Sequence, residues 1–174
     1  TDFFRNVHCV MGLPIDAMSM DEAVQLLQKA RVNRSKCFFS TPNLNFVIAS
    51  QKQAEFRESV CMSNLSLADG MPLVWVAKLL RIPIRERVSG SDLFDRLRHQ
   101  TESLWRVFFF GGPKGVGQEA CLAIGDQSVG VLPTGYIYPG FVNTDEMSRE
   151  DLLQCINQSE PDMVVVSLGA AKGQ

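Results

Sequence analysis

Short apolar runs alternate along this chain with longer segments of helical pattern, and this alternation limits the folds open to it. Strands are expected at residues 36–40, 65–68, 105–110, 129–132 and 163–168. Helices are expected at residues 19–31, 43–50, 53–61, 72–80, from 89 onward, 115–124 and 145–158. Strands that alternate with helices predict an α/β fold, with a mostly parallel sheet and helices on both of its faces.

Length and composition restrict the class of protein further. The 174 residues suffice for one domain with a core, and we expect a single domain over residues 1–174. A net charge of −2 without a basic block argues against a nucleic-acid partner. No run is long and apolar enough to span a bilayer and no signal peptide is visible, so a cytoplasmic location is expected. The chain has two histidines and no clustered metal ligands, which predicts no zinc site.

Polar residues directly follow two of the expected strands. Thr41-Pro42-Asn43 ends the first strand, and Asp69-Gly70 ends the second. In an α/β protein, polar groups just past the carboxyl ends of parallel strands point into the crevice where ligands bind. We therefore expect the Thr41 hydroxyl, the Asn43 amide and the Asp69 carboxylate to meet in one pocket. Each of these residue types also caps helices, and that structural role stays open for all three.

A third strand end is rich in glycine and reads Gly111-Gly112-Pro113-Lys114-Gly115. A strand, a glycine turn and a helix present free amides and a helix dipole that favour a phosphate, although a tight turn without ligand is the alternative. Residues 115–120 also match a dinucleotide-binding fingerprint, but the strand ends too early and the next strand carries no acid. A nicotinamide-dependent oxidoreductase is therefore the weaker hypothesis. An acid beside a phosphate-binding turn indicates group transfer from a phosphorylated donor.

Two further segments have an unusual composition. The expected helix at residues 72–80 is apolar on most sides, so it is either buried or faces a partner or lipid. Residues 135–141 are aromatic and rich in proline and glycine, which predicts a loop. No Asp-x-Asp pair occurs anywhere, so we expect a donor site without a metal or other cofactor.

Several segments in register resemble the WecG/TagA/CpsF family of bacterial glycosyltransferases over nearly the whole chain. They are Thr41-Pro42-Asn43, Leu67-Ala68-Asp69-Gly70-Met71-Pro72, Arg87-Val88-Ser89-Gly90-Ser91-Asp92-Leu93, Phe109-Phe110-Gly111-Gly112, Gly140-Phe141, and Pro161-Asp162 to Gly169-Ala170. The resemblance implies a Rossmann-like fold. It also implies inverting transfer of a sugar from a UDP-sugar donor to a polyprenyl-diphosphate-linked acceptor, in the synthesis of cell-surface polysaccharide.

The resemblance also implies roles for individual residues. It assigns the family's catalytic aspartate to Asp69, its pocket threonine and asparagine to Thr41 and Asn43, and its pocket arginine to Arg87. An inverting displacement needs one base that takes the proton of the acceptor hydroxyl, and Asp69 fits that role. Thr41 and Asn43 are expected to hold the donor or acceptor sugar.

The leaving diphosphate needs a stabilising environment of its own. We expect Arg87, the turn at Gly111 and Gly112, and Lys114 to supply it. Gly135 and Tyr136 are placed beside the uracil by their position in the expected loop.

The end of the chain departs from the family pattern. Members commonly read Gly-Ala-Pro-Lys-Gln-Glu where this chain has Gly169-Ala170-Ala171-Lys172-Gly173-Gln174, which leaves the donor sugar open. The family continues into a C-terminal appendage that meets the membrane. We expect that part to lie beyond Gln174 and to hold the enzyme peripherally at the inner leaflet. The oligomeric state stays open, and a homo-oligomer is one outcome. A nucleotide-sugar-binding module without catalysis stays open as an alternative function.

Overall fold

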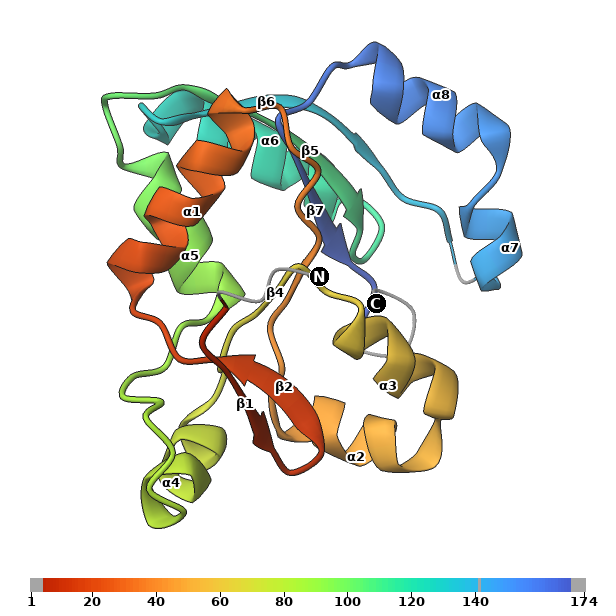
Figure 1. The fold of residues 1–174 in the computed structure, drawn as a ribbon. Helices are drawn as coiled ribbons and strands as arrows, with labels where there is room; N and C mark the ends of the chain where they lie inside the picture. Colours follow the sequence, from red (N-terminus) through yellow and green to blue (C-terminus); the bar gives the residue numbers. More distant parts are fainter. Residues whose placement is uncertain (1–4, 141, 170–174) are drawn as a thin grey trace. The chain divides into compact units, whose positions relative to one another are not determined.

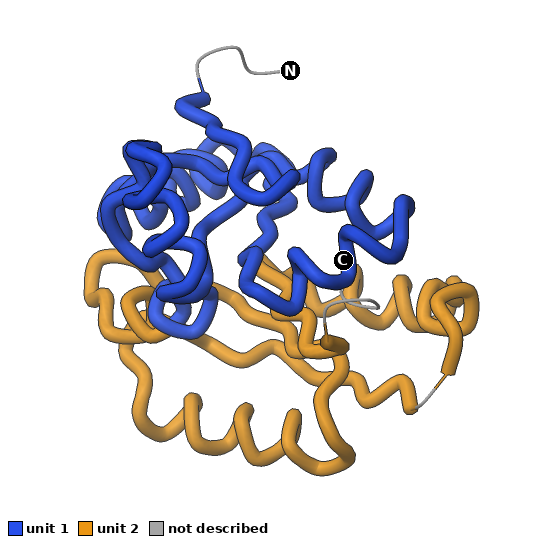
Figure 2. The backbone as a smooth tube through the Cα atoms, turned by 90° about the horizontal axis from the view of Figure 1, so that it is seen from below, with its two compact units in different colours: residues 1–94, 174 blue, residues 95–173 orange. Residues whose placement is uncertain are grey.

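The computed structural model describes residues 5–140 and 142–169. The backbone divides into two compact units, residues 1–94 and residues 95–173, which Figure 2 shows in separate colours. The expected single domain stays a prediction. Within the described ranges, no helix has the length and apolar character needed to cross a membrane.

Unit 1 combines an antiparallel hairpin, a short parallel strand pair and the helices that connect them (Figure 1). In chain order its elements are β1 (Val7–Val10), β2 (Leu13–Asp16), α1 (Met20–Val32), β3 (Phe39–Ser40), α2 (Leu44–Lys52), α3 (Ala54–Cys61), β4 (Leu65–Ser66), α4 (Met71–Leu79) and α5 (Gly90–Arg98), the last of which continues past the unit boundary. β1 pairs with β2, and β3 pairs in parallel with β4, so that Ser40 lies opposite Ser66.

Local signals in the sequence predicted the helices of unit 1 well. The capping box before α1 is present: the Ser19 hydroxyl accepts the Glu22 N–H, and the Glu22 carboxylate accepts the Ser19 N–H at 2.7 Å. The hairpin of β1 and β2 was not predicted. Its turn residues Met11 and Gly12 both have positive φ, 50° and 87°, a geometry in which asparagine or aspartate before glycine is the usual signal.

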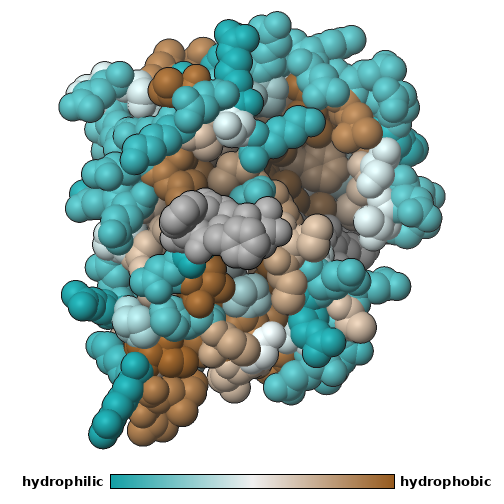
Figure 3. All heavy atoms as spheres, viewed as in Figure 1, coloured by the Kyte–Doolittle hydropathy of each residue, from teal (hydrophilic) through white to brown (hydrophobic). Residues whose placement is uncertain are grey.

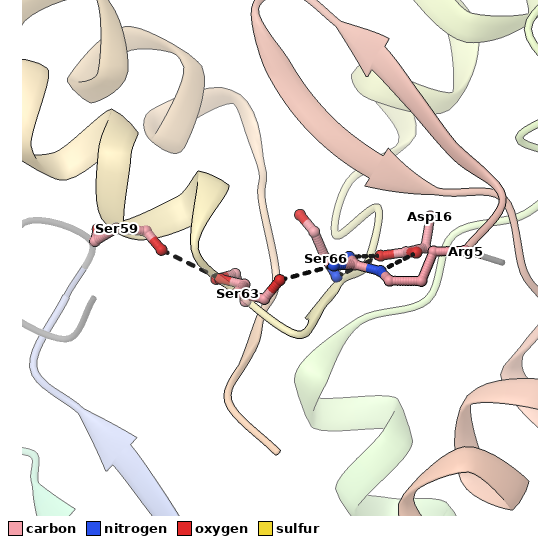
Figure 4. Close-up of polar contacts among 6 residues, drawn as sticks. Arg5, Asp16, Ser59, Ser63 and Ser66 are labelled. Atoms are coloured by element: carbon pink, nitrogen blue, oxygen red, sulfur yellow. Dashed lines mark hydrogen bonds and ion pairs between the residues drawn. The ribbon is translucent and has the colours of Figure 1, made fainter. Parts of the chain in front are cut away.

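A buried carboxylate ties the hairpin to the parallel pair (Figure 4). Asp16, at the end of β2, accepts bonds from Arg5 Nε at 3.0 Å and Arg5 Nη2 at 2.6 Å. It also accepts the backbone N–H of Ser66 in β4 at 2.7 Å. Arg5 Nη1 donates to the Ser63 carbonyl at 2.9 Å. These bonds fix β4, whose carboxyl end leads to Asp69.

Unit 2 is built on a three-stranded parallel sheet in the order β6-β5-β7. Its remaining elements are β5 (Trp105–Gly111), α6 (Val116–Gln127), β6 (Val131–Ile137), α7 (Thr144–Met147), α8 (Glu150–Gln158) and β7 (Met163–Ser167). The neighbouring residues Val107 and Phe108 are both buried, so the central strand β5 is covered on both faces, as the sequence predicted. Helix α6 packs against β6.

Three expectations for unit 2 were wrong. β6 extends beyond the predicted strand and contains Gly135 and Tyr136, which were expected in a loop. Pro133 is tolerated there because β6 is an edge strand of this sheet and its pairing with β5 shifts register at this point. The expected helix at 145–158 is two helices that break at Ser148 and Arg149. The strand at 163–168, expected from its apolar run to be buried, is the edge strand β7 with partly exposed valines.

The predicted α/β class is confirmed in a coarse form. Strands and helices alternate, and β3 with β4 and β5 with both of its neighbours pair in parallel. Both parallel sheets are small.

Candidate functional site

The segments that follow β3 and β4 run side by side in unit 1. The Leu67 N–H donates to the Ser40 carbonyl at 2.9 Å, and the Asp69 N–H donates to the Pro42 carbonyl at 2.8 Å. A methyl group added at Gly70 would lie 3.7 Å from Asn43 Cβ. The structure therefore brings the two polar strand ends together.

Arg87 reaches the same place from the loop before α5. Its Nη1 lies 3.7 Å from Asp69 Oδ1, and its Nη2 forms a short ion pair with the carboxylate of Asp92. The guanidinium is therefore shared between two acids. The loop is held there because the Val88 N–H donates to the Ala68 carbonyl at 2.9 Å.

The adjacent residue Glu86 anchors this loop a second time. Its carboxylate accepts the backbone N–H of Met20 at 2.7 Å, at the first residue of α1. Arg87 thus sits between two neighbours whose hydrogen bonds reach distant parts of unit 1.

Thr41 lies against the first turn of α5. A methyl group added at Gly90 would come within 3.2 Å of Thr41 Cγ2 and 3.7 Å of Thr41 Oγ1, so the absence of a side chain at Gly90 allows this approach. We call the resulting group the strand-end cluster. Its members are Thr41, Asn43, Asp69, Arg87 and Asp92.

Sequence reasoning missed one member of the cluster, Asp92. It lies within a segment that carried the family resemblance, but no role was assigned to it. Its backbone N–H donates to the Ser89 hydroxyl at 3.1 Å, which fixes it in the first turn of α5. Only the pairing with Arg87 distinguishes it from an ordinary first-turn acid, and that pairing depends on the fold.

Helix capping explains Asn43 but leaves Asp69 unexplained. Asn43 is the N-cap of α2, and its Oδ1 accepts the N–H groups of Asn45 at 3.0 Å and Phe46 at 3.2 Å. The side-chain NH2 of Asn43 is thus the part that could serve a ligand. The N-cap of α4 is Gly70, so Asp69 lies one residue before the cap. Its carboxylate faces Arg87 instead.

The electrostatic environment makes Asp69 a better proton acceptor than a free aspartate. Burial raises the pKa of its carboxyl group, and the attraction of Arg87 opposes this increase. Repulsion from Asp92 raises the pKa of Asp69 further. Since a base with a higher pKa holds an abstracted proton more firmly, ionised Asp69 is suited to general base catalysis.

The predicted phosphate turn lies in unit 2, between β5 and α6. A methyl group on Gly111 would fall 2.7 Å from the Ser167 carbonyl oxygen, so this glycine permits the pairing with β7. The Gly112 N–H donates to the same carbonyl at 2.7 Å and is therefore not free for a phosphate, contrary to expectation. What the turn offers is the exposed Lys114 and the first-turn amides of α6, which follow Gly115 in the left-handed conformation.

The two positions proposed for the uracil have packing roles in β6. A methyl group on Gly135 would come within 2.6 Å of the Phe108 ring. Tyr136 packs over Gly117, where an added methyl group would lie 3.1 Å from the tyrosine ring. Gly117 is the middle glycine of the dinucleotide fingerprint, and here it lies inside α6 under that ring. This placement argues against the nicotinamide hypothesis.

Metal binding finds no support in the part of the chain that the structure describes. Over residues 5–140 and 142–169, no three His, Cys, Asp or Glu side chains gather as metal ligands.

In α/β proteins, ligands bind in the crevice outside the carboxyl ends of the parallel strands, and the strand-end cluster follows two such strands. The chain belongs to the glycosyl transferase WecG/TagA/CpsF family, whose model matches residues 8–174, and the resemblance inferred from the sequence is confirmed.

Three similar proteins carry the name N-acetylglucosaminyldiphosphoundecaprenol N-acetyl-beta-D-mannosaminyltransferase. The Bacillus spizizenii protein is 28% identical over 148 residues, which cover 84% of this chain and 56% of the relative. The Bacillus subtilis protein is 24% identical over 162 residues, covering 92% and 61%. The Staphylococcus aureus protein is 22% identical over 168 residues, covering 94% and 63%. The chain thus spans about three fifths of the length of these relatives.

Proposed function

We propose that this chain is the catalytic part of an inverting glycosyltransferase that moves a sugar from a UDP-sugar to a polyprenyl-diphosphate-linked saccharide. The observation that carries the proposal is the partly buried Asp69 carboxylate at a strand end, which caps no helix and faces Arg87. The names of the relatives suggest an N-acetylhexosamine as the donor sugar and an N-acetylglucosaminyl diphosphate lipid as the acceptor.

The strand-end cluster supports one displacement step. Asp69 takes the proton from an acceptor hydroxyl while the oxygen of that hydroxyl forms a bond to C1 of the donor sugar. The bond from C1 to the UDP oxygen breaks on the opposite side, and its electron pair leaves with the diphosphate. Thr41 and the NH2 group of Asn43 hold sugar hydroxyls, and the Arg87 charge favours the negative charge that develops on the leaving group.

The turn between β5 and α6 is the proposed diphosphate site of unit 2. The Lys114 ammonium and the amides at the start of α6 both favour an anion. Gly111 and Gly112 shape this turn, but the Gly112 N–H is bonded to the Ser167 carbonyl and does not contact the phosphate. Tyr136 presents a partly exposed ring that could stack on uracil, and Gly135 allows that strand to pack.

The finer description of the protein follows from the family. We propose a Rossmann-like fold for the single domain, a C-terminal appendage beyond Gln174, and a peripheral position at the inner leaflet.

Two measurements test this function. UDP should raise the unfolding temperature of the chain without added metal, since a ligand at 100 times its dissociation constant stabilises by about 2.7 kcal/mol. Asp69→Asn should abolish transfer from UDP-N-acetylhexosamine to a synthetic lipid-diphosphate acceptor in the protein with its C-terminal part, while UDP stabilisation persists. A melting curve indifferent to millimolar UDP would contradict the assignment. UDP binding without turnover in the parent protein would indicate a binding module.

A further inference from the structure

Helix α4 is apolar on two opposite faces. Its residues Leu73, Val74 and Ala77 are buried in unit 1. Met71, Trp75 and Leu79 are 40%, 61% and 82% exposed. A helix in the outer layer of a protein normally presents polar residues to water, so the second apolar face needs an explanation.

The exposed residues form one continuous stripe. Each helical residue turns about 100°, so a step of four residues advances only about 40° around the axis. Met71, Trp75 and Leu79 therefore occupy a sector of about 80°, roughly opposite the buried residues. We call these three residues the outer stripe. Figure 3 shows apolar side chains gathered over α4 at the lower left.

Positively charged residues lie close to the outer stripe in the sequence. Lys78, Arg81 and Arg85 are all exposed, within or shortly after α4. The only acid in residues 70–87 is Glu86, and its carboxylate is engaged by the Met20 N–H. This segment is therefore cationic in a chain whose net charge is −2.

We propose that the outer stripe, with Lys78, Arg81 and Arg85, is a membrane contact that inserts at the surface of a bilayer containing anionic lipid. Tryptophan is favoured at the membrane–water interface, and an interfacial helix pairs apolar anchors with basic residues. The inference rests on the proposed function, in which the acceptor lipid stays in the bilayer. Since α4 begins two residues after Asp69, this contact would hold the strand-end cluster close to the acceptor headgroup.

A second copy of the chain fits this surface less well. In a symmetric dimer the same patch contacts itself, so the three cations of each copy would lie near those of the other. Anionic lipid headgroups instead match the sign of the charge, and each basic residue near such a surface strengthens binding.

Intrinsic fluorescence gives a direct test, because the chain has two tryptophans and the other, Trp105, is only 2% exposed. Vesicles of phosphatidylcholine and phosphatidylglycerol should shift the emission of Trp75 to shorter wavelength. Lipids brominated on the acyl chain should quench it. Pure phosphatidylcholine vesicles, or high salt, should reduce the binding strongly because the charge attraction is then absent or screened.

Vesicle sedimentation with variants identifies the surface. Leu79→Gln should weaken partition about tenfold, since a buried leucine side chain is worth at least this factor. Lys78→Gln and Arg81→Asn should each weaken binding to anionic vesicles roughly fivefold. Asparagine suits position 81 because its φ is 57°, in the left-handed region. The matched control is Leu122→Gln, an exposed leucine of α6, which should leave partition unchanged.

Any of three results would overturn the proposal. The first is equal vesicle binding by Leu79→Gln and Leu122→Gln, and the second is no spectral change with anionic vesicles. The third is a blue shift that follows protein concentration without lipid and accompanies dimer formation in sedimentation velocity, which would assign the stripe to a second copy. UDP stabilisation, measured on the same samples, separates failure of this surface from failure of the proposed function.

Discussion

Removal of Arg5 should destabilise unit 1 strongly, because it would leave the Asp16 carboxylate buried with a single amide partner. The Asp16 side chain is 1% exposed and that of Arg5 is 23% exposed. Loss of one member of a fully buried ion pair costs about 3–5 kcal/mol. Since water reaches part of Arg5, we expect about 3 kcal/mol for Arg5→Ala, at the lower end of that range. In a chain of this size that corresponds to a decrease in Tm of roughly 6–12 °C.

The same reasoning predicts a rescue. Asp16→Asn keeps an oxygen that accepts the Ser66 N–H but removes the charge that Arg5 balances. The double variant Arg5→Ala with Asp16→Asn should therefore be more stable than Arg5→Ala alone. Urea unfolding followed by circular dichroism measures each free energy. Arg149→Ala is the control, because its pair with Asp151 is exposed and should contribute less than about 1 kcal/mol.

Two results would refute this account of the network. An Arg5→Ala variant that loses no more stability than Arg149→Ala would mean that the buried carboxylate does not need the guanidinium. A double variant less stable than Arg5→Ala would mean that the Asp16 carboxylate stabilises the fold even without its partner.

Three further predictions concern the site and the sheet. The pKa of Asp69 is raised above its ordinary value of 3.8, so the ionisation of Asp69 lowers the stability of the fold as the pH rises through the folded-state pKa. Urea unfolding at pH 4 and at pH 7 should therefore show that Asp69→Asn gains stability relative to the parent protein at the higher pH. In the transfer assay, Asp92→Asn should move the acidic limb of kcat/KM to lower pH and Arg87→Gln should move it to higher pH; shifts in the same direction would exclude Asp69 as the base seen in that profile. Gly135→Ala should cost about 1–3 kcal/mol in urea unfolding through overpacking, whereas Gly125→Ala, with open space around it in α6, should be neutral or stabilising.

Features encoded by neighbouring residues could be predicted from the sequence. The capping box at Ser19 predicted α1, and Asn43 predicted the start of α2, because a capping residue and its helix are neighbours in the sequence. The polar residues after β3 and β4 could be placed together because parallel strands end on the same edge of a sheet.

What could not be predicted depends on contacts between distant residues. The expected strand ended at residue 132, directly before Pro133, and only the irregular pairing of β6 with β5 makes this proline compatible with a strand. The sequence predicted that the Gly112 N–H would bind a phosphate, but in the fold this N–H donates to the Ser167 carbonyl of β7. Asp92 received no role from the sequence, because only the folded loop before α5 brings Arg87 to it.

The double anchoring of the Arg87 loop means that the arginine backbone is ordered before any ligand arrives. Fixing the backbone of one residue costs about 1–2 kcal/mol of free energy at room temperature through lost conformational entropy. For Arg87 this cost arises when the protein folds and not when the ligand binds. An anionic ligand therefore meets an arginine whose backbone is already fixed. Because one anchor joins Glu86 to the amide of Met20, we expect the first residue of α1 to influence the affinity of a site that it does not touch.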